Sequence, residues 1–167
     1  MKPTPTPPPE SRPGFHREQF DDGQRDPYAL RAKLAEPAVC SECGAVYQEG
    51  RWQWLPAPPN AAAVQCAACR RILEKVPAGY VAVSGAFALA HRLELLELVR
   101  NHEAREKKEH PLQRIIAIDE QDDGLMITTT DIHLARGIAE ALEHAYKGTL
   151  DYHYLPDQYL LRVRWER

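Results

Sequence analysis

The sequence predicts an α+β protein in which a small cysteine-rich module precedes a larger domain of strands and helices. Two Cys-x-x-Cys pairs stand close together in a stretch rich in turn residues. From Gly79 onward, alternating and helical hydrophobic patterns follow one another in the order strand, helix, strand, strand, helix, strand, strand. With 167 residues, 44% of them hydrophobic, the chain can bury one core and a small appended module.

The first segment, residues 1–26, is proline-rich and polar, so we expect a disordered tail. It has no continuous apolar segment of the kind a signal peptide needs, and no run in the chain approaches the about 20 apolar residues that span a bilayer. We therefore expect a cytoplasmic protein without membrane contact. Asp26 as N-cap and Pro27 at the first helical position predict a short helix within Arg25–Glu36, with Tyr28, Leu30 and Leu34 as its apolar face.

The second segment, residues 27–78, holds the cysteines, and their spacing is typical of a structural zinc ribbon. Redox-active pairs and four unligated core thiols are the alternatives, but no thioredoxin-like pattern surrounds the pairs. Four thiolates would leave the ion no open coordination position, so Zn²⁺ would hold the fold rather than catalyse. Gly44 suits a tight turn after the first pair, whereas Arg70 after the second pair predicts a less regular turn. The predicted ligands are Cys40, Cys43, Cys66 and Cys69.

Cations and aromatic residues stand near the cysteines. Trp52 and Trp54 occur at strand spacing, before a turn-rich stretch. Because aromatic rings stack on unpaired bases and arginines pair with phosphate, this mixture suits RNA. The alternative is that at least one tryptophan fills the core of the module. The candidate contacts here are Arg51, Trp52, Arg70, Arg71 and Lys75.

The third segment, residues 79–167, begins with the strand-like GYVAVSG. A helix is predicted over residues 86–109, ending before Pro111, with Leu89, Leu93, Leu96 and Val99 at helical spacing. QRIIAIDEQDDGLMITTT predicts a hairpin around an Asp-Gly turn.

A second helix should begin at an Asp131 N-cap and end near Gly148. Its predicted buried side comprises Ile132, Ala135, Ile138, Ala139, Leu142 and Tyr146. Two strands separated by PDQ finish the chain. The first six elements match a ferredoxin-like βαββαβ unit, which leaves the last strand as an extra one.

The last two strands should turn one face to the helices and leave the other open. Leu150, Tyr152 and Tyr154 with Leu161, Val163 and Trp165 form the inward set, and Asp151, His153, Arg162 and Arg164 form the outward set. Arg162 and Arg164 are therefore further candidate RNA contacts.

No catalytic motif emerges from the sequence. His102 and His110 lie near glutamates, but they lack the four-residue spacing of His-Glu-x-x-His, and neither a Gly-rich phosphate loop nor a serine nucleophile elbow occurs. We therefore expect a protein that is not an enzyme.

The stretches CSECGAVYQEGRWQW, CAACRRI, LVRNHEAREKKEHPLQRI and TTTDIHLAR resemble a bacterial family described as NMD proteins affecting ribosome stability and mRNA decay. The resemblance spans Asp26 to Arg167. Its longer archaeal and eukaryotic relatives include an export adaptor of the large ribosomal subunit. Those relatives carry more zinc sites and continue beyond the first α/β unit. The resemblance implies zinc at the four cysteines and association with ribosomes or RNA.

The formal net charge of −3 does not favour a broadly basic nucleic-acid binder, so any RNA contact should come from local patches. The sequence hypothesis is a non-enzymatic zinc-binding factor that associates with ribosomes or structured RNA. The alternative is a protein–protein adaptor with a structural zinc site and no nucleic-acid contact.

Overall fold

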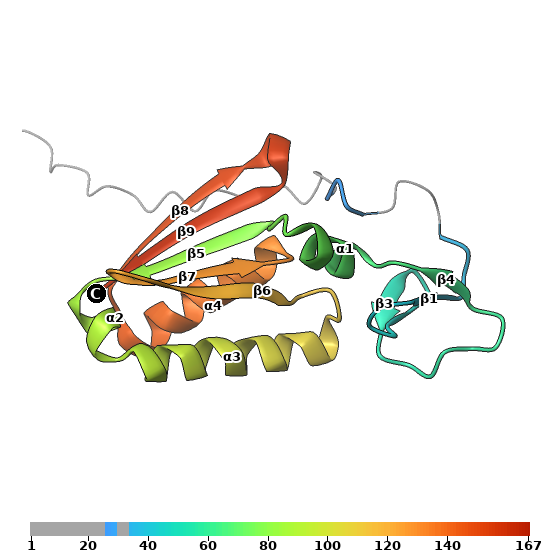
Figure 1. The fold of residues 1–167 in the computed structure, drawn as a ribbon, viewed down its shortest axis with the longest axis horizontal. Helices are drawn as coiled ribbons and strands as arrows, with labels where there is room; N and C mark the ends of the chain where they lie inside the picture. Colours follow the sequence, from blue (N-terminus) through green and yellow to red (C-terminus); the bar gives the residue numbers. More distant parts are fainter. Residues whose placement is uncertain (1–25, 30–33) are drawn as a thin grey trace, which may run out of the picture.

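A computed structural model describes residues 26–29 and 34–167, which form a mixed α+β structure with two sheets and four α-helices (Figure 1). The predicted tail lies outside the described residues apart from Asp26, and so do residues 30–33 of the predicted first helix. Asp26 to Ala29 form a turn in which the amide of Tyr28 donates to the Asp26 carboxylate over 2.9 Å. No described helix is long and apolar enough to cross a membrane.

The first sheet consists of β1 (Ala38–Cys40), β2 (Val46–Gln48), β3 (Arg51–Gln53) and β4 (Ala62–Val64). The strand order is β3-β2-β1-β4, and β1 and β4 run parallel. Glu49 and Gly50 connect β2 to β3 with φ angles of 56° and 75°. The Glu36 carboxylate accepts both of their amides, over 2.9 and 3.2 Å. Helix α1 (Ala67–Glu74) follows β4, and together these elements form the cysteine module.

The remaining elements form the α/β domain, in which a sheet carries helices on one face (Figure 1). Its strands are β5 (Gly79–Ser84), β6 (Ile115–Gln121), β7 (Gly124–Thr129), β8 (Thr149–Leu155) and β9 (Leu160–Glu166). Its helices are α2 (Ala86–Ala90), α3 (Arg92–Glu109) and α4 (Ile132–Tyr146), and a 3₁₀ turn at Pro156–Gln158 joins β8 to β9. Helices α3 and α4 lie against the same face of the sheet, and no described helix covers the opposite face.

The order of elements is as predicted, but the order of strands in the sheet is not that of a ferredoxin-like unit. The sheet runs β6-β7-β5-β9-β8, with β7 antiparallel between β5 and β6. A ferredoxin-like unit would place β8 next to β5, whereas here β9 takes that position, parallel to β5. The inward residues of β9 (Leu161, Val163 and Trp165) are buried, and those of β8 (Leu150, Tyr152 and Tyr154) are half-buried. The more apolar strand therefore occupies the inner position.

The long helix predicted over residues 86–109 is broken at His91. His91 has φ −117° and ψ 27°, outside helical geometry, and its imidazole stacks on the ring of Phe87 with the ring centroids 4.1 Å apart. The predicted apolar face is wrong in its first half, because Ala88 and Leu95, seven residues apart, face the core there instead of Leu89 and Leu93. Leu89 and Leu93 are 46% and 81% exposed, and α3 buries Leu95 together with the predicted Val99.

Helix α4 confirms its predicted start and its buried face. The Asp131 carboxylate accepts the amide of Leu134 over 3.0 Å, as an N-cap does. The buried residues of α4 include the predicted set except Tyr146, which is half-buried, and add Leu134. Trp165 is fully buried beneath this helix and donates from Nε1 to the carbonyl of Lys147 over 2.7 Å.

Candidate metal centre and surface residues

The four predicted cysteine ligands come together at one point. Their Sγ atoms all lie within 4.8 Å of one another, and those of Cys43 and Cys66 are 3.9 Å apart. A tetrahedral Zn²⁺ with bonds of about 2.3 Å to sulfur requires sulfur–sulfur separations of about 3.8 Å. A shortening of the sulfur–sulfur separations by at most about one ångström would therefore seat the ion, and the four-cysteine cluster can hold a metal such as zinc.

Two different local structures present the cysteine pairs. Cys40 ends β1, and the chain turns back through Gly44 (φ 77°), whose amide donates to the Cys40 carbonyl over 2.9 Å. Cys66 is the N-cap of α1, and its sulfur accepts the amide of Cys69 over 3.4 Å. The second pair thus uses the first turn of a regular helix that includes Arg70, rather than the less regular turn expected there.

Electrostatics in the cluster favour a bound cation. Burial opposes ionisation of Cys40, but backbone amides of Cys66, Cys43 and Glu42 directed at its sulfur lower its pKa to about 7. Burial, reinforced by the charges of the neighbouring thiolates, raises the pKa of Cys66. Ionisation of all four cysteines is therefore unfavourable unless a positive ion lies between them, and a divalent metal would supply that charge.

An arginine of the α/β domain completes the surroundings of the cysteines. Nη2 of Arg114 donates to the sulfurs of Cys66 and Cys69, over 3.3 and 3.2 Å. Leu112 and Trp52 also pack against the cysteine cluster. Our sequence reasoning missed Arg114, because it follows Cys69 by 45 residues and no local pattern marks it.

The structure corrects the assignment of Arg71 as an RNA contact. Only 2% of this side chain is exposed. It donates to the carbonyl of Val76 over 3.0 Å and to the carboxylate of Asp26 over 2.5 Å. Its guanidinium also lies over the ring of Tyr28, 4.1 Å from the centroid. Because α1 turns this position inward, Arg71 stabilises the junction between α1 and the turn at Asp26 and presents no cation to a partner.

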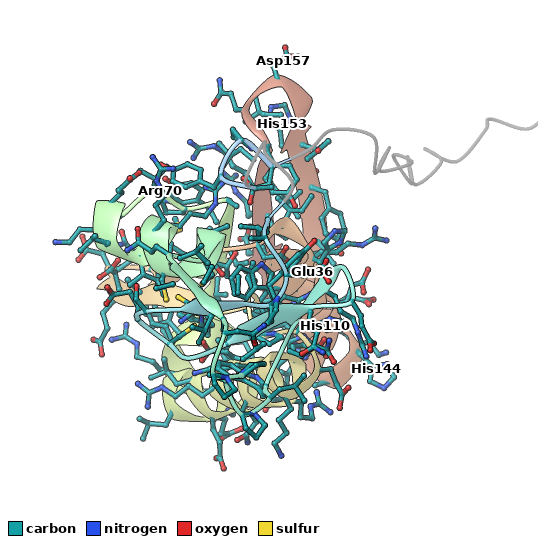
Figure 2. The ribbon with its side chains drawn as sticks, turned by 90° about the vertical axis from the view of Figure 1, so that its right-hand side faces the viewer. Glu36, Arg70, His110, His144, His153 and Asp157 are labelled. Atoms are coloured by element: carbon teal, nitrogen blue, oxygen red, sulfur yellow. The ribbon has the colours of Figure 1, made fainter. Side chains whose placement is uncertain are left out.

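The other candidates in the cysteine module lie on separate elements. Arg70 is exposed on α1 (Figure 2) and pairs with Glu74 over 3.0 Å, while Lys75 is the exposed C-cap of α1. Arg51 is exposed on the edge strand β3. Trp52 is half-buried and packs on the cysteines, so the alternative that a tryptophan serves the module's core holds at this position.

Arg162 and Arg164 lie on the open face of the sheet, as predicted. Both are exposed, and the guanidinium of Arg162 lies over the ring of Tyr80, 4.7 Å from its centroid. His153 stands opposite Arg162 near the tip of the β8–β9 hairpin (Figure 2). Helix α1 and this hairpin lie close together, because the guanidinium of Arg71 on α1 is 6.0 Å from the centroid of the Tyr159 ring in the β8–β9 connection.

His102 and His110, whose spacing does not match the His-Glu-x-x-His motif, form no second metal site among the described residues. His102 lines a cavity of about 540 Å³ between α3 and α4, together with His133, Glu140 and His144. Among the described residues, the cysteines are the one group with ligand atoms close enough to hold a metal.

Comparison of the chain with protein-family models, curated proteins and solved structures found no match. The coordinates of the described residues therefore establish the class of protein: an α+β structure with a four-cysteine site that can hold a metal ion.

Proposed function

We propose that this protein is a non-enzymatic zinc-binding factor that associates with ribosomes or RNA in the cytoplasm. The observation that carries the proposal is the cluster formed by the sulfurs of Cys40, Cys43, Cys66 and Cys69. Four thiolates fill the tetrahedral shell that zinc prefers in structural sites. Zinc would therefore hold β1, the loop after β4 and α1 together rather than activate water or a substrate.

The open face of the sheet is the better of the two proposed RNA contacts. Tyr80 and Arg162 form a stacked pair there, and Arg164 lies on the same face of β9. Open sheets recognise single-stranded RNA by stacking bases on aromatic rings while cations contact phosphates. Asp151 stands opposite Arg164, so the contact must be local rather than a broad basic surface.

The second proposed contact is the exposed cationic side of the cysteine module, formed by Arg51, Arg70 and Lys75. It would assist by phosphate contact, with Arg71 removed from the set because it is buried. The family resemblance in the cysteine and TTTDIHLAR stretches supports the ribosomal form of the proposal.

A protein–protein adaptor is the second candidate, and exposed apolar side chains on α1 and just after its C-cap favour it. Ile72, Leu73 and Val76 are 36%, 72% and 40% exposed. The net charge of −3 is no obstacle to this role. Binding to RNA phosphates weakens steeply as salt rises, whereas a largely apolar protein interface changes little.

The test is co-sedimentation of the zinc-saturated protein with ribosomes and with separated subunits, at low and high salt. The variant is Arg162→Glu/Arg164→Glu. Its matched control is Arg100→Glu/Lys108→Glu, which makes the same charge change at exposed positions of α3. Salt-sensitive pelleting that the sheet-face variant loses and the control keeps supports RNA contact through this face.

Pelleting that neither salt nor the sheet-face variant reduces would favour the adaptor. The absence of any pelleting by the wild-type protein would refute ribosome association.

A further inference from the structure

We infer that Arg114 is an outer-sphere residue of the metal centre that couples metal binding to attachment of the cysteine module to the α/β domain. The inference rests on the metal-binding half of the proposed function and not on RNA association. It begins from the position of the side chain, of which 8% is exposed. One nitrogen, Nη2, reaches the sulfurs of both Cys66 and Cys69.

The backbone of Arg114 is fixed to the sheet of the α/β domain. Its amide donates to Oγ1 of Thr130 over 3.0 Å, and its carbonyl accepts the amide of Thr130 over 2.9 Å. The hydroxyl of Thr130 also donates to the carbonyl of Leu112 over 2.6 Å. Thr130 lies between the end of β7 and the N-cap of α4. The loop that carries Arg114 therefore belongs rigidly to the α/β domain, while the sulfurs belong to the module.

A metal bound by all four cysteines would strengthen the contact between Arg114 and the sulfurs. The ion would hold Cys66 and Cys69 side by side, at a separation that one nitrogen can bridge. A metal with four thiolates carries a net charge of about −2, and the guanidinium of Arg114 offsets part of it in a buried place. Arg114 is thus best stabilised when the metal is bound and the two parts are attached.

Metal binding and attachment of the module should each strengthen the other. If the metal strengthens attachment of the module through Arg114, attachment must strengthen metal binding by the same factor. Outer-shell partners of metal ligands typically change metal affinity by about 10- to 100-fold. Attachment has an independent reporter, because the indole Nε1 of Trp54 in the module donates to the carbonyl of Lys107 on α3 over 2.7 Å.

The experiment compares Arg114→Met, Arg114→Lys and the control Arg92→Met in the full chain. Methionine keeps the aliphatic stem and removes the guanidinium, whereas lysine keeps the charge without the fork. Arg92 pairs with Glu120 on the surface of the same domain, so its loss controls for removing an arginine ion pair. Zinc affinity is measured by competition with a chromophoric chelator, and attachment by hydrogen exchange of the Trp54 indole N–H in NMR spectra.

We expect Arg114→Met to lower zinc affinity by about 10- to 100-fold, Arg114→Lys to lower it less, and Arg92→Met to leave it within about twofold. Chelation should speed exchange of the Trp54 indole in the wild type. In Arg114→Met the exchange should already be fast with zinc bound.

Zinc affinity of Arg114→Met within about twofold of the wild type would overturn the inference, as would indole exchange that ignores chelation. If Arg114→Met does not fold, the same two criteria apply to Arg114→Lys. A wild-type chain that holds no stoichiometric zinc would instead refute the metal site itself, before any variant is compared.

Discussion

Arg70 and Arg71 are neighbours in the sequence, yet replacing each by methionine should have very different consequences for stability. Arg71→Met keeps the buried stem and deletes the guanidinium. It removes a hydrogen bond to the Val76 carbonyl and a charge-assisted bond to the Asp26 carboxylate. These are worth about 1 kcal/mol and about 1.5–3 kcal/mol, so we expect a loss of about 3 kcal/mol in the free energy of unfolding.

Arg70→Met removes a surface pair with Glu74 in which the arginine side chain is 52% exposed. Because solvent screens such an exposed i,i+4 pair, its loss should change the free energy of unfolding little, and this variant is the matched control. The assay is urea unfolding of the zinc-saturated protein, followed by circular dichroism. At an m-value of about 2 kcal/mol/M, the midpoint of Arg71→Met should fall by about 1.5 M with m unchanged.

A midpoint for Arg71→Met within about 0.3 M of the wild type would refute the assignment of a structural role to this side chain. The pelleting assay gives an independent check, because Arg71→Met should bind ribosomes as the wild type does once both are folded. A selective loss of pelleting at unchanged stability would return Arg71 to the candidate contact surface.

Three further variants test the metal site and the α/β core. Cys66→Ser should abolish stoichiometric zinc binding and remove most of the metal's contribution to folding, on the order of 10 kcal/mol; a zinc content equal to that of the wild type contradicts the site. Burial lowers the pKa of His102, so the folded protein holds this imidazole neutral. Its contribution to the free energy of unfolding is therefore full above about pH 6.5 and is lost as pH falls. His102→Gln should therefore flatten the fall in unfolding free energy as pH drops below about 6.5, and an unchanged slope rejects this. Trp165→Phe deletes the hydrogen bond to the Lys147 carbonyl and should lower the free energy of unfolding, measured in urea, by about 1–2 kcal/mol. A decrease below about 0.5 kcal/mol would contradict this role of the indole.

Features set by neighbouring residues were predictable from the sequence. The ligand quartet follows from Cys-x-x-Cys spacing, and the start of α4 follows from Asp131 ahead of a helical pattern. The alternation of β9 likewise placed Val163 inward and Arg162 outward. In each case the signal lies within one element, where the helical or strand period decides which side chains share a face.

Features set by distant contacts were not predictable in this way. Next to the break at His91, Phe87 packs on Tyr146 and Trp165 from distant parts of the chain, and no local pattern marks this break. The position of β9 inside the sheet depended on competition with β8 for burial. Arg114 reached the cysteines across 45 residues of chain, and nothing in its own surroundings distinguishes it from a surface arginine.

The burial of Arg71 and Arg114 also limits what RNA binding can look like in this protein. Of the cations proposed from the sequence, the exposed ones are Arg51, Arg70, Lys75, Arg162 and Arg164. Each phosphate contact to a single strand contributes about 0.7 to the slope of log affinity against log salt, so five contacts give at most about 3.5. A measured slope steeper than about 4 would require cations outside this set, whereas a slope near zero would favour the adaptor. The salt slope therefore tests how many cations contact phosphates, and it also distinguishes RNA binding from a protein–protein contact.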